Sequence, residues 1–309
     1  MSEKINTAII IKSTGKDYRI RIDNGDIIDA NLKGKMRTQG LRTTNPVAVG
    51  DKVKYIIEDG KAMIMELIPR KNHIIRKSIN LSKEAHIVAA NVDQALLIVT
   101  PDKPPTSFGF IDRFLVAAES YNIPTTIVIN KIDLPGTEER IAELMMTYEM
   151  IGYPVLLVSA LNNKNTEEIK TLLKDKVTVL AGHSGVGKSS LINRVEPGLL
   201  LRTSEISAYH QKGKHTTTFA EMFPLSFGGY IIDTPGIKGY GIIGLDKNEL
   251  ALYFPEMAKK LPECKFYNCT HINEPKCAVK KAIEEGEIPE SRYKSYLNIF
   301  NEDPDKSYR

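Results

Sequence analysis

The pattern of hydrophobic and polar positions changes near residue 70. Before that point, short runs alternate between apolar and polar residues, as in Thr7–Lys12 and Asp17–Ile22. Alternation with period two predicts half-buried β-strands. Val53–Ile57 and Ala62–Leu67 flank the turn Glu58–Lys61 and predict a hairpin. About five short strands in so small a segment predict a closed β-barrel of the OB type.

Apolar runs become continuous after about residue 92. Strands are expected at Gln94–Thr100, Thr126–Asn130, Val155–Ser159, Val177–Ala181 and Tyr230–Asp233. Helical patterns lie between several of these runs. Continuous apolar strands that alternate with helices indicate a mostly parallel, doubly wound α/β sheet covered on both faces. The basic stretch Pro69–Lys77 before them is interpreted as a linker.

The last part of the chain has helical patterns again. Helices are expected at Lys247–Phe254, Ala278–Gly286 and Ser291–Asn301. The fold class is therefore multidomain α/β. The predicted domains are a barrel at residues 1–72, an α/β domain at residues 73–243 and a helical domain at residues 244–309.

Composition places the chain among ordinary globular proteins. It has 309 residues, of which 42% are hydrophobic and 26% charged, and a net charge of +4. No apolar run approaches the roughly 20 residues of a membrane span, and the first residues lack a signal-peptide core. We therefore expect a cytoplasmic protein without membrane contact. We also expect it to be a monomer. The predicted barrel surface leans basic and indicates RNA binding, although a solvated spacer explains it equally well: Lys12, Lys16, Arg19, Arg21, Lys33, Lys35, Arg37 and Arg42.

The stretch after Val177–Ala181 has the spacing of a phosphate-binding P-loop. Its pattern G-x-x-x-x-G-K-S follows an expected strand and precedes a helical pattern. Glycines let backbone N–H groups converge on phosphate oxygens at a helix N-terminus. We expect Lys188 to reach the β- and γ-phosphates as a catalytic residue and Ser189 to bind Mg²⁺. The predicted nucleotide-binding residues here are Gly182, His183, Ser184, Gly185, Val186, Gly187, Lys188, Ser189 and Ser190.

Two further motifs at strand ends indicate that the nucleotide is GTP. The motif N-K-x-D, which reads guanine in GTPases, is present as Asn130, Lys131, Ile132 and Asp133. The Asp133 carboxylate can accept hydrogen bonds from N1–H and the 2-amino group of guanine, and adenine has neither donor. Asn130 can tie this loop to the P-loop. The pair Ser159 and Ala160 corresponds to the element that offers a backbone N–H to guanine O6.

The switch elements follow the P-loop. Asp233–Gly236 has the pattern D-x-x-G, in which Asp233 would hold Mg²⁺ through water and Gly236 would contact the γ-phosphate. Thr217 is the favoured switch threonine, with Thr216 and Thr218 as alternatives. Many GTPases place a glutamine after D-x-x-G to orient water, but this chain has Ile237. His215 is a candidate for that catalytic role, and a solvated loop residue is its alternative interpretation.

The order of these motifs is permuted. Common GTPases have the P-loop first, whereas N-K-I-D and S-A precede it here. The same sheet forms if the original termini are joined and the chain is opened elsewhere. The sequence therefore predicts a circularly permuted GTPase domain in which D-x-x-G leads directly into the C-terminal segment.

The three cysteines of the chain lie in one short segment with a histidine. Cys264, Cys269, His271 and Cys277 make a complete tetrahedral donor set for one structural Zn²⁺, with no position left for a catalytic water. An odd cysteine count also argues against a disulfide framework. The alternative is three free buried thiols beside an unrelated histidine.

These motifs together resemble the ribosome small-subunit-dependent GTPase A family (RsgA, also called YjeQ). The resemblance rests on N-K-I-D before the P-loop, the run His215–Thr218, Asp233–Gly236 and the Cys/Cys/His/Cys segment, and it covers nearly the whole chain. It implies a GTPase that binds the small ribosomal subunit and its rRNA, acts late in subunit maturation, and is activated by the subunit. The family also has a hydrophobic residue at the position of Ile237.

We therefore expect GTP hydrolysis, with bound GTP holding the subunit-binding state and hydrolysis releasing the protein. Two other functions remain open at this point. One is a nucleotide-gated metallochaperone, in which the Cys/His cluster transfers metal. The other is an RNA-binding regulator whose GTPase is vestigial.

Overall fold

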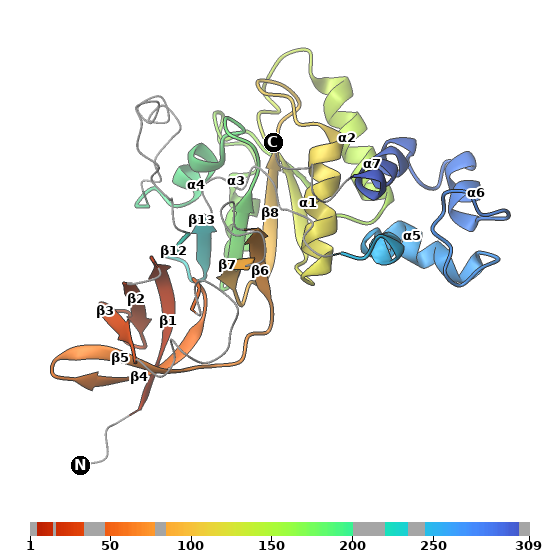
Figure 1. Cartoon of the computed structure of the whole chain (residues 1–309). Helices are drawn as coiled ribbons and strands as arrows, with labels where there is room; N and C mark the ends of the chain where they lie inside the picture. Colours follow the sequence, from red (N-terminus) through yellow and green to blue (C-terminus); the bar gives the residue numbers. More distant parts are fainter. Residues whose placement is uncertain are drawn as a thin grey trace, which may run out of the picture.

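Three parts of the chain form an elongated arrangement with the α/β sheet in the middle (Figure 1). The structure, a computed structural model, describes residues 5–14, 17–33, 47–77, 85–199, 220–233 and 245–302. The barrel lies at one end, at lower left, and the C-terminal helices lie at the other (Figure 1). Within the described residues, no helix has the length and apolarity that crossing a membrane would need.

The first part is a closed barrel of five strands, as predicted. These are β1 (Asn6–Ser13), β2 (Tyr18–Ile22), β3 (Ile27–Leu32), β4 (Lys52–Glu58) and β5 (Lys61–Leu67). They pair in the order β1-β2-β3-β5-β4, and β4 pairs again with β1 to close the sheet. Ile10, Tyr18 and Ile20 are at most 1% exposed and form its core with neighbouring apolar residues. The alternation seen in the sequence therefore separates an inner from an outer face.

The central part confirms the doubly wound sheet. Its strands are β8 (Gln94–Val99), β9 (Thr125–Ile129), β10 (Val155–Leu157), β11 (Val177–Ala181), β12 (Glu221–Pro224) and β13 (Tyr230–Asp233). The order is β10-β9-β8-β11-β13-β12, and all neighbours are parallel except β12 and β13. Helices α1 (Phe108–Ser120) and α2 (Glu138–Met150) share one buried cluster with the sheet, and α3 (Thr166–Leu173) and α4 (Lys188–Val195) share another.

The barrel and the central sheet are continuous, which the sequence did not predict. Strand β1 pairs antiparallel with β12, opposite Glu221, so that eleven strands form one sheet. Lys12 Nζ lies 3.3 Å from the Glu221 carboxylate, and the Arg21 guanidinium donates to the Tyr230 hydroxyl. These two basic residues therefore hold the junction between the parts and are half-buried. Arg19 and Lys33 remain exposed, and the other predicted basic residues, Lys16, Lys35, Arg37 and Arg42, lie outside the described residues.

The predicted linker Pro69–Lys77 is wrong in its second half. Strand β6 (His73–Lys77) pairs antiparallel with β7 (Ala85–Ala90) in a separate two-stranded sheet. Ile74 is 3% exposed and joins the core cluster of the central sheet. Burial of this apolar residue stabilises a strand in a segment whose basic residues had suggested a solvated connection.

The C-terminal part is built from short helices around its own core. Its elements are η3 (Lys247–Tyr253), α5 (Pro255–Lys260), η4 (Leu261–Glu263), α6 (Ala278–Glu284) and α7 (Glu290–Asn301). The first predicted helix is thus a 3₁₀ helix. The buried cluster of this part includes Val116 of α1, so the C-terminal part packs directly on the central domain.

A buried ion-pair network fixes α7 against α1. The Arg292 side chain is completely buried, and its guanidinium donates to Asp112 at 2.9 Å and to Glu256 at 2.8 Å. Burial alone would lower the pKa of Arg292, but the carboxylates of Glu256 and Asp112 raise it, so the guanidinium stays charged. The guanidinium also lies 4.3 Å from the ring centre of Phe254. The central and C-terminal parts therefore share a buried charged contact.

Substitution Arg292→Met is expected to lower the free energy of unfolding by about 3–5 kcal/mol, because two carboxylates then stay buried without their cation. Urea unfolding followed by circular dichroism measures the loss. The control is Lys294→Met on the exposed side of the same helix, where the lysine pairs with Glu290, and a change within about 0.5 kcal/mol is expected there. Equal losses in the two variants would contradict a stabilising role for the network.

Candidate nucleotide and metal sites

The P-loop connects β11 to α4 and needs glycine at two described positions. Gly182 has a φ of +139°, and a Cβ atom there would lie 2.3 Å from the carbonyl oxygen of Ile98. Gly187 has a φ of +89°, and a Cβ atom would lie 2.5 Å from Asn130 Nδ2. Both contacts are too close for any side chain. The two glycines therefore let the loop approach β8 and the N-K-I-D loop.

Lys188 lies at the first position of α4, and its side chain folds back over the P-loop. Its Nζ donates to the carbonyl oxygens of Gly182 and His183, each at 2.7 Å. Burial lowers the pKa of Lys188, while the nearby charge of Asp233 acts in the opposite direction. Asp233 is the last residue of β13, next to β11 in the sheet. The ammonium group and this carboxylate thus lie at the same edge of the sheet, where helix α4 begins and directs its N–H groups outward.

Asn130 joins three loops through one buried side chain. It follows β9 and is 1% exposed. Its Nδ2 donates to the carbonyl oxygen of Val186 in the P-loop at 2.8 Å, and its Oδ1 accepts from the Ala160 N–H at 3.2 Å. The asparagine makes the tie to the P-loop that its place in the sequence predicted. The Ala160 N–H, which the sequence assigned to guanine O6, donates to the Asn130 side chain in this structure. The contact of this N–H with a guanine base therefore stays a prediction.

Asp133 and Lys131 are held in place by neighbouring groups. The Ser159 hydroxyl donates to the Asp133 carboxylate and also accepts from the Asn162 N–H at 3.0 Å. Lys131 Nζ donates to the carbonyl oxygen of Gly185 at 2.7 Å and to that of Lys103. Ser159, which the sequence marked only as a member of the S-A pair, therefore orients the carboxylate expected to bind guanine.

The structure brings the predicted residues around Asn130, Lys188 and Asp233 to one edge of the sheet. Parallel strands present their carboxyl ends at this edge, which is where ligands bind in open α/β folds. Predicted residues in the switch segments lie outside the described residues: His215, Thr216, Thr217, Thr218, Gly236 and Ile237.

The sequence did not mark the loop between β8 and α1 as part of this site. Pro104 Cδ lies 3.2 Å from the Cβ position of Gly185, and Lys103 accepts from Lys131 as described above. The Phe110 ring lies 3.6 Å from the His183 ring, measured between ring centres. The side chain of His183 thus contacts α1. Only the two prolines and the aromatic residues after the strand could have suggested this contact.

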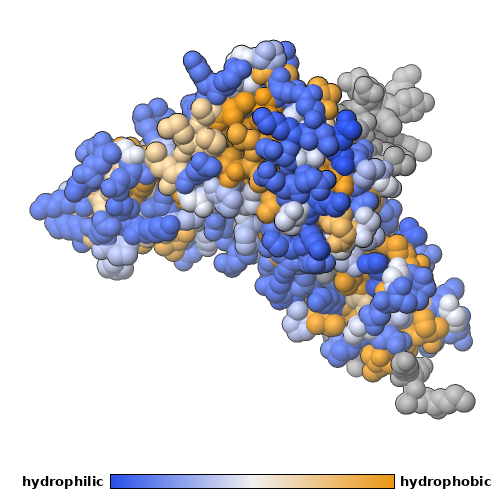
Figure 2. All heavy atoms as spheres, turned by 180° about the vertical axis from the view of Figure 1, so that it is seen from behind, coloured by the Kyte–Doolittle hydropathy of each residue, from blue (hydrophilic) through white to orange (hydrophobic). Residues whose placement is uncertain are grey.

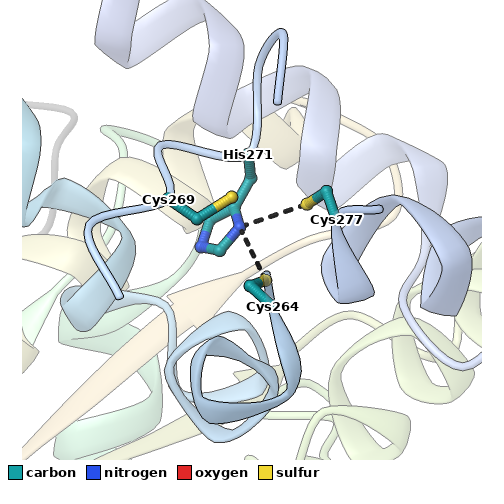
Figure 3. Close-up of side chains that lie close together, drawn as sticks. All are labelled: Cys264, Cys269, His271 and Cys277. Atoms are coloured by element: carbon teal, nitrogen blue, oxygen red, sulfur yellow. Dashed lines mark hydrogen bonds between the residues drawn. The ribbon is translucent and has the colours of Figure 1, made fainter. Parts of the chain in front are cut away.

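The Cys/His segment forms a compact donor cluster (Figure 3). The ligand atoms of Cys264, Cys269, His271 and Cys277 lie within 4.8 Å of one another. His271 Nδ1 lies 3.3 Å from Cys277 Sγ and 3.7 Å from Cys264 Sγ. A tetrahedral zinc ion with ordinary bond lengths would separate sulfur and nitrogen by about 3.5 Å. These distances, three sulfur atoms and one imidazole nitrogen fit Zn²⁺.

The surrounding protein shields most of this cluster from solvent. Cys269, His271 and Cys277 are buried, and Cys264 is partly buried. Burial raises the pKa of the Cys269 thiol to about 12 and lowers that of His271. A neutral imidazole is the form that binds metal.

Hydrogen bonds around the cluster fix its backbone. The Tyr293 hydroxyl donates to the His271 carbonyl oxygen at 2.7 Å, and the Tyr296 hydroxyl donates to that of Thr270 at 2.6 Å. The Glu274 carboxylate accepts from the N–H groups of Thr270 and Ile272. These supporting residues were missed, because the sequence showed the two tyrosines only as part of a helical pattern.

Comparison with known families decides which kind of GTP site this is. The family model described as RsgA GTPase matches residues 67–243, more than half of the chain. The chain belongs to the RsgA GTPase family. It is therefore a GTPase, and its motif order is that of a circularly permuted domain, as the sequence predicted.

Relatives and solved structures extend the match over nearly the whole chain. The small ribosomal subunit biogenesis GTPase RsgA of Bacteroides fragilis strain YCH46 is 51% identical over 304 residues, covering 97% of this chain and 98% of that protein. The protein of the same name from Christiangramia forsetii is 49% identical over 306 residues, covering 97% of each. The crystal structure of YjeQ from Thermotoga maritima has a TM-score of 0.80 at 36% identity and covers 96% of this chain and 98% of that one. The circularly permuted GTPase YloQ has a TM-score of 0.75 at 31% identity, covering 99% and 97%.

Substitution Asp133→Asn is expected to weaken GTP binding about 100-fold and to favour xanthosine triphosphate, because xanthine presents a carbonyl at C2 that needs a donor. Competition between the two nucleotides measures the change. Asp29→Asn, which changes an exposed carboxylate of the barrel, is the control and should leave GTP affinity unaltered. Unchanged preference in Asp133→Asn would remove this residue from guanine recognition.

Proposed function

We propose that this GTPase acts in maturation of the small ribosomal subunit, binding the subunit and its rRNA in the GTP state and leaving after hydrolysis. The observation that carries this proposal is the near full-length similarity to proteins named for small ribosomal subunit biogenesis. The fold adds physical support, because the barrel is hydrogen-bonded to strand β12, which follows the switch segment. A change at the switch can therefore move the barrel.

In the proposed nucleotide site, P-loop N–H groups and Lys188 bind the phosphates, while Asp133, Lys131 and the Ser159–Ala160 loop bind guanine. Ser189, Asp233 and the switch threonine, for which Thr217 is the first choice, hold Mg²⁺. The ion neutralises charge on the β- and γ-phosphates when it is bound. The buried side chain of Asn130 supports this assignment, since it fixes the guanine-binding and phosphate-binding loops at one distance.

Hydrolysis is proposed to depend on the subunit. Ile237 occupies the position of the usual water-orienting glutamine and has no polar group for that task. His215 is the candidate within this chain, and docking on the subunit would place it against the attacking water. Slow turnover in the free protein and fast turnover in the complex follow from this arrangement.

The Cys/His cluster is proposed to hold one structural Zn²⁺. A metal-transfer site needs exposed ligands that exchange metal, whereas Cys269, His271 and Cys277 are buried and surrounded by tyrosine and glutamate hydrogen bonds. This burial argues against a metallochaperone. The match to the RsgA GTPase family, whose curated relatives are named as GTPases, likewise argues against a vestigial GTPase.

Co-sedimentation with purified small subunits tests the proposed function. The wild-type protein should bind in the presence of a non-hydrolysable GTP analogue and dissociate with GDP. In Asp133→Asn, binding should instead require a non-hydrolysable analogue of xanthosine triphosphate, and xanthosine diphosphate should cause dissociation. Absence of binding, or equal binding with every nucleotide, would overturn the proposal.

A further inference from the structure

The turn between the first two cysteines presents two aromatic side chains to solvent. Tyr267 is 91% exposed and Phe266 is 39% exposed. Lys265 and Asn268, the other residues between Cys264 and Cys269, are exposed as well. Aromatic side chains usually contribute to cores or interfaces because of their large apolar area. A nearly fully exposed tyrosine next to an exposed phenylalanine therefore indicates a contact surface.

The backbone of this turn is fixed at both ends. Cys264 and Cys269 belong to the donor cluster, and the Cys269 N–H donates to the Phe266 carbonyl oxygen at 3.2 Å. A pre-formed turn loses little conformational entropy when its side chains bind a partner. The aromatic pair is thus presented on a rigid support.

Charge on this segment favours an anionic partner. Residues 259–281 contain six lysines and two glutamates, a net charge of +4. Lys260 pairs with Glu263 and Glu287, and Lys281 pairs with Glu285, so the lysines outside these ion pairs are Lys259, Lys265, Lys276 and Lys280. Lys265 Nζ lies 5.1 Å from the ring centre of Phe266, so cation and aromatic face are combined. The C-terminal part, which carries the donor cluster, projects away from the central domain at the right of Figure 1. The face of this part that is seen from behind is largely hydrophilic (Figure 2).

We infer that Phe266 and Tyr267 stack on unpaired nucleobases of rRNA while the surrounding lysines bind the phosphate backbone. Flat aromatic faces beside cations are the combination that binds single-stranded nucleic acid, and stacking needs no particular base. This inference rests on the proposed function and assigns the base contact to the turn at residues 265–268. An apolar protein contact is the competing explanation, and it would need side-chain bulk but no aromatic face.

The two explanations differ in the affinity that they predict for variants of Tyr267. The measurement uses the full-length protein and purified small subunits with a non-hydrolysable GTP analogue. Tyr267→Phe keeps the aromatic face and should bind within about twofold of the wild type, whereas Tyr267→Leu should bind about tenfold more weakly. Leu252→Ala, at a side chain 50% exposed elsewhere in the same part, is the control and should have no effect. Wild-type affinity in Tyr267→Leu would overturn the inference.

A spectroscopic reporter tests stacking directly, because the chain contains no tryptophan. Tyr267→Trp should be quenched on binding small subunits, and Leu252→Trp should not. Binding without quenching would overturn the inference while leaving the proposed function intact. Failure of the wild-type protein to bind subunits would overturn both.

Discussion

Removal of metal from the Cys264–Cys277 cluster is expected to unfold that segment while the nucleotide site stays folded. Structural zinc stabilises small zinc modules by an apparent free energy of about 10–16 kcal/mol, so its loss exceeds any other single change considered for this part. Helix α7 should remain docked on α1, because the ion pairs of Arg292 with Asp112 and Glu256 contain no residue of the donor cluster. The segment lost is the one that carries Phe266 and Tyr267.

Cys264→Ser and chelator treatment both test this expectation. Zinc content should fall from one ion per chain, limited proteolysis should cut between residues 264 and 277, and GTP affinity should stay within about twofold. Asn273→Ala, at an exposed residue of the same segment that is no ligand, is the control and should keep its zinc. Loss of GTP binding together with the zinc would show that the two sites are not independent.

Substitution Lys188→Ala is expected to reduce the rate of GTP hydrolysis by about 10²–10³-fold, the usual cost of removing a group that stabilises transition-state charge. Among the described residues, the ammonium group contacts the carbonyl oxygens of Gly182 and His183 and lies near the negative charge of Asp233. Alanine has no group to replace these contacts with phosphate oxygens. Single-turnover hydrolysis at saturating GTP measures the effect on the chemical step.

Lys174→Ala is the matched control, because this lysine is exposed at the end of α3. Hydrolysis should be unchanged there, and both variants should unfold at the wild-type urea concentration. A rate in Lys188→Ala within about twofold of the wild type would remove the lysine from catalysis. That result would also favour a vestigial GTPase, since the P-loop would then bind without accelerating the reaction.

Much of the fold could be predicted because local signals and global contacts agree. The unbroken apolar run Gln94–Val99 is a fully buried strand, and the G-x-x-x-x-G-K-S stretch opens helix α4 as expected. These features are determined by residues close together in the sequence. The P-loop glycines, for example, allow the positive φ values that the loop needs. The same holds for the donor cluster, whose four ligands lie within 14 residues of one another.

The features that were missed depend on contacts distant in sequence. Pairing of β1 with β12 joins segments about 200 residues apart, and nothing in either segment alone specifies the partner. The sequence around Arg292 indicates only a helix. In the structure, its side chain is completely buried and pairs with Asp112 and Glu256. Lys12 and Arg21 likewise read as surface residues of a barrel, and only the junction shows why they are half-buried.

GTP turnover with and without purified small ribosomal subunits tests the central claim most directly. The measurement uses the full-length wild-type protein, with Lys188→Ala as the control for contaminating hydrolases. The account predicts slow turnover in the free protein and an increase of about tenfold or more when subunits are added. Turnover that is unaffected by subunits at every salt concentration would contradict it.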